Sequence, residues 1–163
     1  MNCFSQEVLI VRIFLAGIMQ GSLVASEMHE QDYRSRLRNA IPKYLPEYEV
    51  YDPLEFHSDS IGYENKKGRG VFLHHNQMCA EVDVLLACVP EASMGTAIEM
   101  WEAWRHDKLV ISISPMKHNW AVKFLSHVIF EREADFLKAL CDGSLRQQLI
   151  NLGAPLNAKN PNK

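Results

Sequence analysis

The fold of this chain is decided by residues 83–101, which read DVLLACVPEASMGTAIEMW. The first seven residues form an almost unbroken apolar run, which is typical of a strand buried on both faces of a parallel sheet. A turn of small residues follows, and residues 97–106 have the composition of an amphipathic helix. The pattern therefore predicts a strand, a turn and a helix, with Glu99 close to the carboxyl edge of a sheet, where α/β proteins bind ligands.

Comparable patterns extend along the chain in both directions. Apolar runs predict further strands at residues 8–16, 49–51 and 109–113. The intervening segments predict helices over residues 24–40, 72–81 and 120–128, and residues 131–149 hold one or two more. Pro42 and Pro46 are expected to end the first helix. Strands that alternate with helices predict an α/β fold with a parallel sheet and helices on both faces.

Length and charge limit the class of protein. The 163 residues, of which 47% are hydrophobic, are enough for one well-buried core, so we expect a single domain over residues 1–156 and a polar tail over residues 157–163. The net charge of −3 and the scattered basic residues give no reason to bind a nucleic-acid polymer. The longest apolar stretch, residues 8–19, contains Arg12 and is too short to span a bilayer, so neither a signal peptide nor a membrane partner is expected.

The four cysteines indicate the compartment. Cys3, Cys79, Cys88 and Cys141 are spread without C-x-x-C spacing, and a chain of this length needs no disulfide bonds to fold. They are interpreted as reduced thiols, which predicts a cytoplasmic protein.

Four loops are expected to meet at the carboxyl edge of the sheet, at residues 17–22, 52–59, 90–99 and 114–120. Gly17 and Gln20 in the first loop, and Ser93 and Gly95 in the third, are candidate ligand contacts. Ser93 and Gly95 are small residues, which allow a phosphate or sugar to approach closely. Residues 54–70 lack periodicity and are predicted to be a long loop. Residues 57–60 then either contribute to a site or are ordinary solvated loop, and residues 66–70 are either a lid or solvated loop.

Two interpretations of Glu99 are open. Thr96 and Glu99 have the T-x-x-E spacing of a capping box, in which Glu99 only binds the backbone at the helix start. Alternatively, the helix dipole keeps Glu99 ionised as a nucleophile or as a stabiliser of a cationic transition state. On this second interpretation its pKa is low, and Glu99 is a poor general acid.

Several other chemistries are not supported. Residues 17–22, GIMQGS, match neither a dinucleotide-binding nor a triphosphate-binding loop, and no G-x-S-x-G motif of a serine hydrolase is present. His74 and His75 are adjacent, but H-E-x-x-H is absent, so we expect no metal and no cofactor. Trp101 and Trp104 are three residues apart on a predicted helix and are interpreted as packing or subunit contacts.

Three segments together resemble a known family. They are IFLAG at residues 13–17, AEVDVLLA at residues 80–87 and ASMGTAIE at residues 92–99. In this order and spacing they resemble the nucleoside 2-deoxyribosyltransferase superfamily, which includes the nucleotide N-hydrolases. The resemblance spans about residues 9–130. It implies a single-domain flavodoxin-like or Rossmann-like sheet, a homo-oligomer whose sites are completed by a neighbouring subunit, and cleavage of the N-glycosidic bond of a small-molecule nucleoside or nucleotide.

The resemblance also implies roles for individual residues. Glu99 matches the catalytic glutamate, whose carboxylate attacks the anomeric carbon or stabilises its oxocarbenium character, as in retaining glycosidases. Ser93 and Gly95 match the turn that holds the sugar or a 5′-phosphate. Asp83 matches an aspartate that leads a strand. Asn119 and Ser126 lie in a segment that reaches into an adjacent subunit's site in family members.

Two departures from the family pattern leave the proton donor open. Phe14 stands where the family often carries a catalytic tyrosine, and His75 stands near the position of an aspartate that serves the leaving base. The candidate acids are His75, acting near neutral pH, and His57 or Asp59 in the long loop; each is alternatively a surface or packing residue. The leading hypothesis is therefore an enzyme of N-glycosidic cleavage or transfer. The alternative is a non-catalytic nucleotide-binding or sensor domain that retains the fold.

Overall fold

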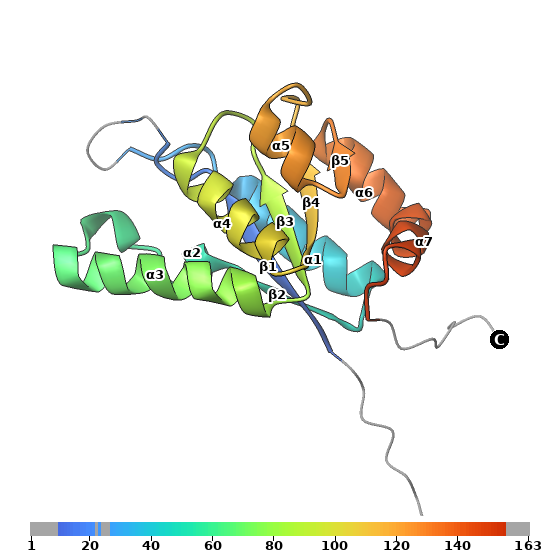
Figure 1. Cartoon of the computed structure of the whole chain (residues 1–163), viewed down its shortest axis with the longest axis horizontal. Coiled ribbons are helices and arrows are strands. Elements are labelled where there is room, and N and C mark those ends of the chain that lie inside the picture. Colours follow the sequence, from blue (N-terminus) through green and yellow to red (C-terminus); the bar gives the residue numbers. More distant parts are fainter. Residues whose placement is uncertain (1–9, 22, 24–26, 156–163) are drawn as a thin grey trace, which may run out of the picture.

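The structure, a computed structural model, describes residues 10–21, 23 and 27–155. The expected tail at residues 157–163 lies outside this part of the chain. The elements, labelled in Figure 1, are β1 (Val11–Gly17), α1 (Asp32–Tyr44), β2 (Tyr48–Tyr51), α2 (Pro53–Phe56), the short helix η1 (Ser60–Gly62), α3 (Asn65–Glu81), β3 (Val84–Cys88), α4 (Met94–Arg105), β4 (Leu109–Ile113), α5 (Trp120–Leu125), β5 (Val128–Phe130), α6 (Glu133–Cys141) and α7 (Ser144–Asn151).

The strands form one parallel sheet in the order β2-β1-β3-β4-β5. This is the flavodoxin-like order, and it confirms the predicted α/β fold. The chain passes from β1 to β2 on one side of the central pair β1 and β3, and from β3 to β4 on the other side. A crevice therefore forms where the carboxyl ends of β1 and β3 diverge, which is the place where doubly wound sheets bind ligands.

Helices cover both faces of the sheet, as the apolar runs predicted (Figure 1). On one face, alternate strand residues such as Leu15 and Leu86 pack against buried side chains of α1, α6 and α7. On the other face, Phe14 and Leu85 pack with Cys79 of α3 and with residues of α4. The strands are apolar throughout because both of their faces are buried.

The first helix differs from its prediction. Of the expected range 24–40, residues 24–26 lie outside the described structure, residues 27–31 are not helical, and α1 begins at Asp32. Pro42 does not end the helix but lies inside it. A proline so near the end of a helix removes only one late backbone hydrogen bond, and the chain leaves the helix at Leu45.

The predicted long loop at residues 54–70 is mostly helical, and residues 66–70, expected to be either a lid or solvated loop, belong to α3. Glu64 caps α3 by accepting hydrogen bonds from the backbone N–H groups of Lys66, at 2.9 Å, and Lys67, at 2.8 Å. This cap begins the helix at Asn65 despite Gly68 and Gly70. Within the described ranges, no helix is both long and apolar enough to cross a membrane.

The chain also has a strand that the sequence patterns missed. Residues 120–128 were predicted to form one helix, but α5 ends at Leu125 and β5 begins at Val128. The backbone N–H of His127 binds the carbonyl of Val110, which draws the chain onto the edge of the sheet. Three residues are too few to show a strand period.

Candidate active site

A pocket of about 650 Å³ lies at the carboxyl edge of the sheet. A volume of this size is typical of small-molecule sites. The residues that line it are Gly17, Met19, Gln20, Gly21, Pro53, His57, Ser60, Ile61, Tyr63, Gly68, Val71, Phe72, His75, Ala92, Ser93, Met94, Gly95, Thr96 and Glu99. Three of the four loops expected to converge contribute to this lining; the loop at residues 114–120 does not.

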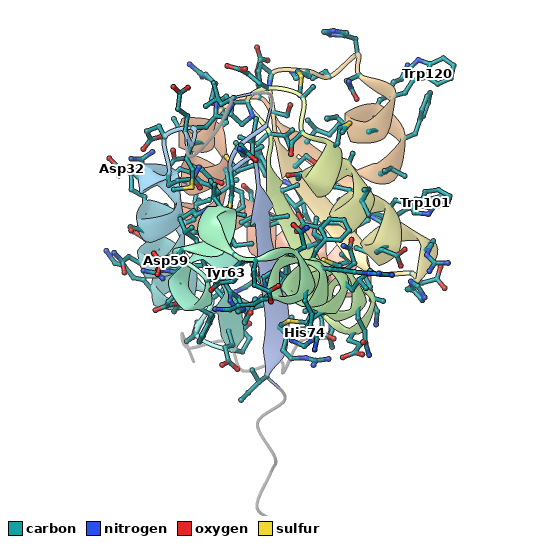
Figure 2. The ribbon with its side chains drawn as sticks, turned by 90° about the vertical axis from the view of Figure 1, so that its left-hand side faces the viewer. Asp32, Asp59, Tyr63, His74, Trp101 and Trp120 are labelled. Carbon is teal, nitrogen blue, oxygen red and sulfur yellow. The ribbon has the colours of Figure 1, made fainter. Side chains whose placement is uncertain are left out.

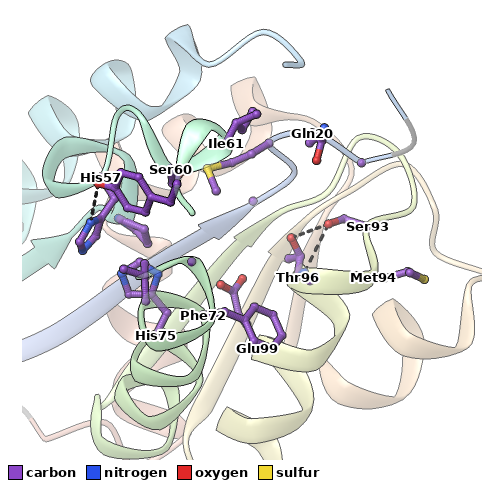
Figure 3. A pocket seen from close by; sticks show the side chains of 18 of the residues that line it. Gln20, His57, Ser60, Ile61, Phe72, His75, Ser93, Met94, Thr96 and Glu99 are labelled. Atoms are coloured by element: carbon purple, nitrogen blue, oxygen red, sulfur yellow. Dashed lines mark hydrogen bonds between the residues drawn. The ribbon is translucent and has the colours of Figure 1, made fainter. Parts of the chain in front are cut away.

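Glu99 projects into the pocket from α4. Ser93 caps this helix, accepting a hydrogen bond from the backbone N–H of Thr96 at 3.3 Å. The helix therefore begins three residues earlier than a cap at Thr96 requires, and Glu99 lies in its second turn. The capping-box interpretation is thus wrong. Figure 3 shows the carboxylate of Glu99 pointing into the pocket, between the wall that carries His75 and the turn that carries Ser93.

The electrostatic environment of Glu99 differs from the prediction. Burial raises the pKa of its carboxyl group to about 7, and the positive charge of Arg34 partly offsets this rise. The expected low pKa depended on the helix dipole, whose influence fades beyond the first turn. Glu99 is therefore ionised in only part of the molecules at neutral pH and can exist in both protonation states there.

Arg34 is a charged residue near the site that sequence reasoning missed. Its guanidinium, 3% exposed as a residue, donates to the carboxylate of Asp52 at 2.7 Å and to the backbone carbonyls of Leu15, at 3.1 Å, and Gly17, at 3.2 Å. These bonds join α1 to the carboxyl ends of β1 and β2. The arginine thus holds the ends of these strands in place beside the pocket. Its positive charge lowers the pKa of Glu99, against the larger effect of burial.

On the other side of Glu99 from Ser93, the wall of the pocket carries two histidines, His57 and His75, each in contact with a tyrosine. The ring centroids of His57 and His75 lie 5.2 Å apart. Tyr63 hydrogen-bonds Nδ1 of His57 at 3.1 Å, and the hydroxyl of Tyr51 lies 3.2 Å from Nε2 of His75. The structure thus brings two of the three candidate acids, together with two tyrosines, to one side of Glu99.

The environment of His75 corrects its expected role. Burial, together with the smaller effects of the nearby His57 and His74, lowers the pKa of its imidazole to about 4. His75 is therefore neutral near pH 7 and does not act there as an imidazolium acid, contrary to the expectation. Within the described part of the chain, no three His, Cys, Asp or Glu side chains are grouped so as to hold a metal ion.

Tyr63 and Phe72 also line the pocket but were not predicted to do so, whereas Ser60 belongs to the predicted candidate segment 57–60 and does line it. Ser60 Oγ is buried and has no hydrogen-bond partner among the described residues. All three residues fall in the segment interpreted as a solvated loop or at the start of the following helix.

Gly17 ends β1 under close packing. A Cβ at this residue would lie 2.0 Å from the hydroxyl oxygen of Tyr33 and 3.1 Å from the carbonyl oxygen of Cys88. Gly95, in contrast, has open space where its Cβ would be, although it also lines the pocket. The two candidate glycines therefore differ in role. Gly17 allows Tyr33 to pack against the end of β1, whereas the space beside Gly95 is open towards the pocket.

Four other predicted site residues, Asp59, Asp83, Asn119 and Ser126, do not line the pocket. Asp59 is exposed at the start of η1 (Figure 2), and its backbone carbonyl accepts from Gly62. Asp83 stands at the amino end of β3, opposite the pocket, where its carboxylate accepts from the backbone N–H of Arg12 at 2.7 Å. These placements do not support a catalytic role for Asp59 or a substrate contact for Asp83 in this subunit.

Asn119 and Ser126 flank α5 and have local partners. Asn119 caps this helix by accepting from the backbone N–H of Ala121 at 3.0 Å. Ser126 shares a hydrogen bond of 2.7 Å with Ser112 of β4. Neither borders the pocket.

Comparison with known proteins finds similar structures but no similar sequence family. No protein-family model and no curated protein sequence matches the chain. Among solved structures, a 2-deoxyribosyltransferase from Bacillus psychrosaccharolyticus is similar with a TM-score of 0.59 and 18% identity, covering 78% of this chain and 90% of its own. A conserved protein from Enterococcus faecalis V583 has a TM-score of 0.59 and 16% identity, covering 82% of this chain and 99% of its own.

A third similar structure is that of BlsM, with a TM-score of 0.56 and 15% identity, covering 94% of this chain and all of its own. At these identities the likeness concerns the arrangement of helices and strands. The chain has a nucleoside 2-deoxyribosyltransferase-like fold.

Proposed function

We propose that this protein is an enzyme that cleaves or transfers at the N-glycosidic bond of a nucleoside or nucleotide, with Glu99 as the nucleophile. The observation that carries the proposal is the carboxylate of Glu99, which points into a pocket of about 650 Å³ at the diverging ends of β1 and β3. The 2-deoxyribosyltransferase-like fold and the catalytic glutamate that Glu99 matches support the same assignment.

The proposed reaction has two displacements. A carboxylate oxygen of Glu99 attacks the anomeric carbon, and the bond from that carbon to the base nitrogen breaks with its electron pair on the base. The base is protonated as it leaves. Water, or a second base, then attacks the anomeric carbon, and the bond from that carbon to Glu99 breaks with its electron pair on the carboxylate. The proton lost by the attacking group passes to the acid that protonated the first base. The first step requires ionised Glu99, which its pKa of about 7 provides in part of the molecules at neutral pH.

We assign protonation of the leaving base to His57. It is less buried than His75 and lines the same wall of the pocket. Its bond to Tyr63 leaves Nε2 as the ring nitrogen that can carry a proton towards a ligand. Ser93, Gly95 and Gln20, on the opposite side of Glu99, are proposed to hold the sugar end of the substrate.

Base release from a panel of ribo- and deoxyribonucleosides and their 5′-monophosphates, with and without an acceptor base, tests the proposal by chromatography. Glu99→Gln is expected to reduce release by at least about a thousandfold, since it removes the nucleophile. Glu102→Gln is the matched control, because Glu102 lies on the same helix and pairs with Arg105 at 2.9 Å. A panel with no turnover, or a Glu99→Gln variant as active as the parent, contradicts the proposal.

A second candidate function is a nucleotide sensor without turnover. Phe14, fully buried against Tyr51 at 5.6 Å between ring centroids, supplies no hydroxyl to the site, and this favours the alternative. A ligand that binds without base release is expected to raise the unfolding free energy by about 2.7 kcal/mol at a hundred times its Kd. Thermal shift combined with chromatography of the same samples separates the two functions.

We propose further that the protein self-associates through α4 and α5. Trp101 is 49% exposed and Trp120 is 78% exposed, and Figure 2 shows both projecting on the same side of the molecule. Trp104 stacks on Trp101, with ring centroids 5.5 Å apart, and Phe124 adds a ring beside Trp120. A second copy is the proposed occupant of this aromatic face, because α4 carries Glu99 and the family resemblance implies sites shared between subunits.

The location proposed is the cytoplasm. Cys79, Cys88 and Cys141 are free thiols, which suits a reducing compartment.

A further inference from the structure

A hydrogen bond between Tyr51 and His75 joins the sheet to the wall of the pocket. The hydroxyl of Tyr51 lies 3.2 Å from Nε2 of His75. Tyr51 itself is held between two rings, Phe56 at 5.0 Å with nearly parallel planes and Phe14 at 5.6 Å. The tyrosine is therefore placed by β2 and by stacking, and its hydroxyl reaches His75 from outside the pocket.

Both partners of this hydrogen bond are uncharged near neutral pH. Burial raises the pKa of the Tyr51 hydroxyl, so the phenol keeps its proton. Burial also lowers the pKa of His75 to about 4, so the imidazole carries one proton, on either Nδ1 or Nε2. Which nitrogen carries it depends on the direction of the hydrogen bond to Tyr51.

The chemistry of the two groups favours donation by the tyrosine. The unprotonated nitrogen of an imidazole is a stronger acceptor than a phenol oxygen, and the phenol O–H is a good donor. Among the described residues, the Tyr51 hydroxyl has no hydrogen-bond partner except His75. When Tyr51 donates, Nε2 is the acceptor and the imidazole proton resides on Nδ1.

Nδ1 of His75 is left for a ligand. The ring lines the pocket, and Nδ1 makes no hydrogen bond within the described part of the chain. We propose that Tyr51 is a positioning residue, which holds His75 as the neutral Nδ1–H tautomer so that His75 donates a hydrogen bond to an acceptor atom of the leaving base. The assignment of that acceptor to a base rests on the proposed function; the tautomer itself does not.

The two histidines of the wall would then differ in chemistry. Tyr63 engages Nδ1 of His57, whereas Tyr51 engages Nε2 of His75. His57 supplies a proton, and His75 supplies a fixed hydrogen-bond donor that strengthens as negative charge develops on the departing base. Bases that present a ring nitrogen or a carbonyl oxygen to His75 are preferred over analogues in which that acceptor is replaced by C–H.

The tautomer is measurable without any substrate. Long-range ¹H–¹⁵N correlation spectra of the ¹⁵N-labelled protein at pH 7 distinguish a protonated from an unprotonated imidazole nitrogen, and a His75→Gln sample assigns the signals. The wild-type protein is expected to show His75 protonated on Nδ1. In Tyr51→Phe the signal is expected to shift towards protonation on Nε2, which free imidazole side chains prefer.

Tyr48→Phe is the matched control, because Tyr48 lies on the same strand and its buried hydroxyl has no hydrogen-bond partner among residues 10–21, 23 and 27–155. It is expected to leave the His75 signals unchanged. Protonation of His75 on Nε2 in the wild-type protein overturns the proposal, and so does a Tyr51→Phe spectrum identical to that of the wild type.

Kinetics test the second half of the proposal on whichever substrate the panel identifies. Tyr51→Phe is expected to lower kcat about threefold to tenfold with little change in KM, because one hydrogen bond in the transition state is weakened. An unchanged kcat contradicts the role of His75 towards the base. Absence of turnover in the wild-type protein refutes the proposed function instead, while the spectra still decide the tautomer.

Discussion

The hydroxyl oxygen of Tyr33 occupies the space into which a side chain at residue 17 would extend, since a Cβ on Gly17 would lie only 2.0 Å from it. The same hydroxyl is buried and has no hydrogen-bond partner in the part of the chain that the structure describes. The end of β1 and the first turn of α1 therefore depend on the absence of a side chain at residue 17, directly beside the pocket.

Gly17→Ala is expected to reduce the unfolding free energy by about 2 kcal/mol, because the tyrosine or the strand must move. Gly95→Ala is the control, since its Cβ meets open space. Tyr33→Phe removes the clashing oxygen, so the double variant Gly17→Ala/Tyr33→Phe is expected to recover most of the loss. Urea unfolding of the wild type, the two single variants Gly17→Ala and Tyr33→Phe, and the double variant forms a double-mutant cycle. Strictly additive changes in unfolding free energy contradict the described contact.

The raised pKa of Glu99 has a consequence for stability. A carboxyl group whose pKa is about 7 in the folded protein and 4.5 when unfolded favours folding below pH 4.5, and this contribution is lost as the pH rises through 7. Glu99→Gln, which cannot ionise, is therefore expected to be more stable than the wild type at pH 8, by about 2 kcal/mol, and nearly equal to it at pH 5. Urea unfolding at both pH values measures the difference. An equal effect at pH 5 and pH 8 argues against the shifted pKa.

The same pKa predicts the pH dependence of activity. Because the nucleophile must be ionised, kcat/KM is expected to rise with pH and to level off above an apparent pKa near 7. Initial rates of base release between pH 5 and pH 9 define the profile. A rise centred near pH 4.5, the ordinary value of a glutamate, contradicts the account of the environment of Glu99.

The exposed aromatic face of α4 and α5, formed by Trp101, Trp104, Trp120 and Phe124, predicts that the protein is an oligomer. Trp101→Glu is expected to convert it to the monomer, since the change places a charge among the exposed aromatic rings of this face. Size-exclusion chromatography with light scattering measures the mass of each variant. Ile150→Glu is the control, because Ile150 is similarly exposed on α7. A monomeric wild-type protein, or a Trp101→Glu variant with unchanged mass, contradicts the proposed interface.

The predictability of the fold from sequence differed between elements. The run LVISI at residues 109–113 was bounded correctly, because a strand buried on both faces has few polar residues to blur its ends. The first turns of α3 were missed because Gly68 and Gly70 weaken the helical pattern, while the cap at Glu64 that offsets them is a single side chain. β5 was missed because three residues are too few to show a strand period, and its pairing with β4 is visible only in the folded chain.

The site was predictable in its location but not in its electrostatics. Glu99 followed from its place after β3 and from the resemblance, yet its pKa depends on how deeply the folded chain encloses it. The contact between Tyr51 and His75 joins residues 24 apart on different elements, so no local pattern reveals it. Arg34 was missed because an arginine on a helix is usually solvated. Its burial depends on the ion pair with Asp52, which lies 18 residues away on another element.

The central claim is that Glu99 is the group that reacts with the anomeric carbon. Nucleosides with fluorine at the 2′ position of the sugar slow the second displacement of a retaining reaction, so that a glycosyl-enzyme accumulates. Mass spectrometry of the wild-type protein is predicted to show the added fluorosugar on the peptide that contains Glu99, and no addition in Glu99→Gln. Base release without any adduct, or an adduct on another residue, would contradict the account.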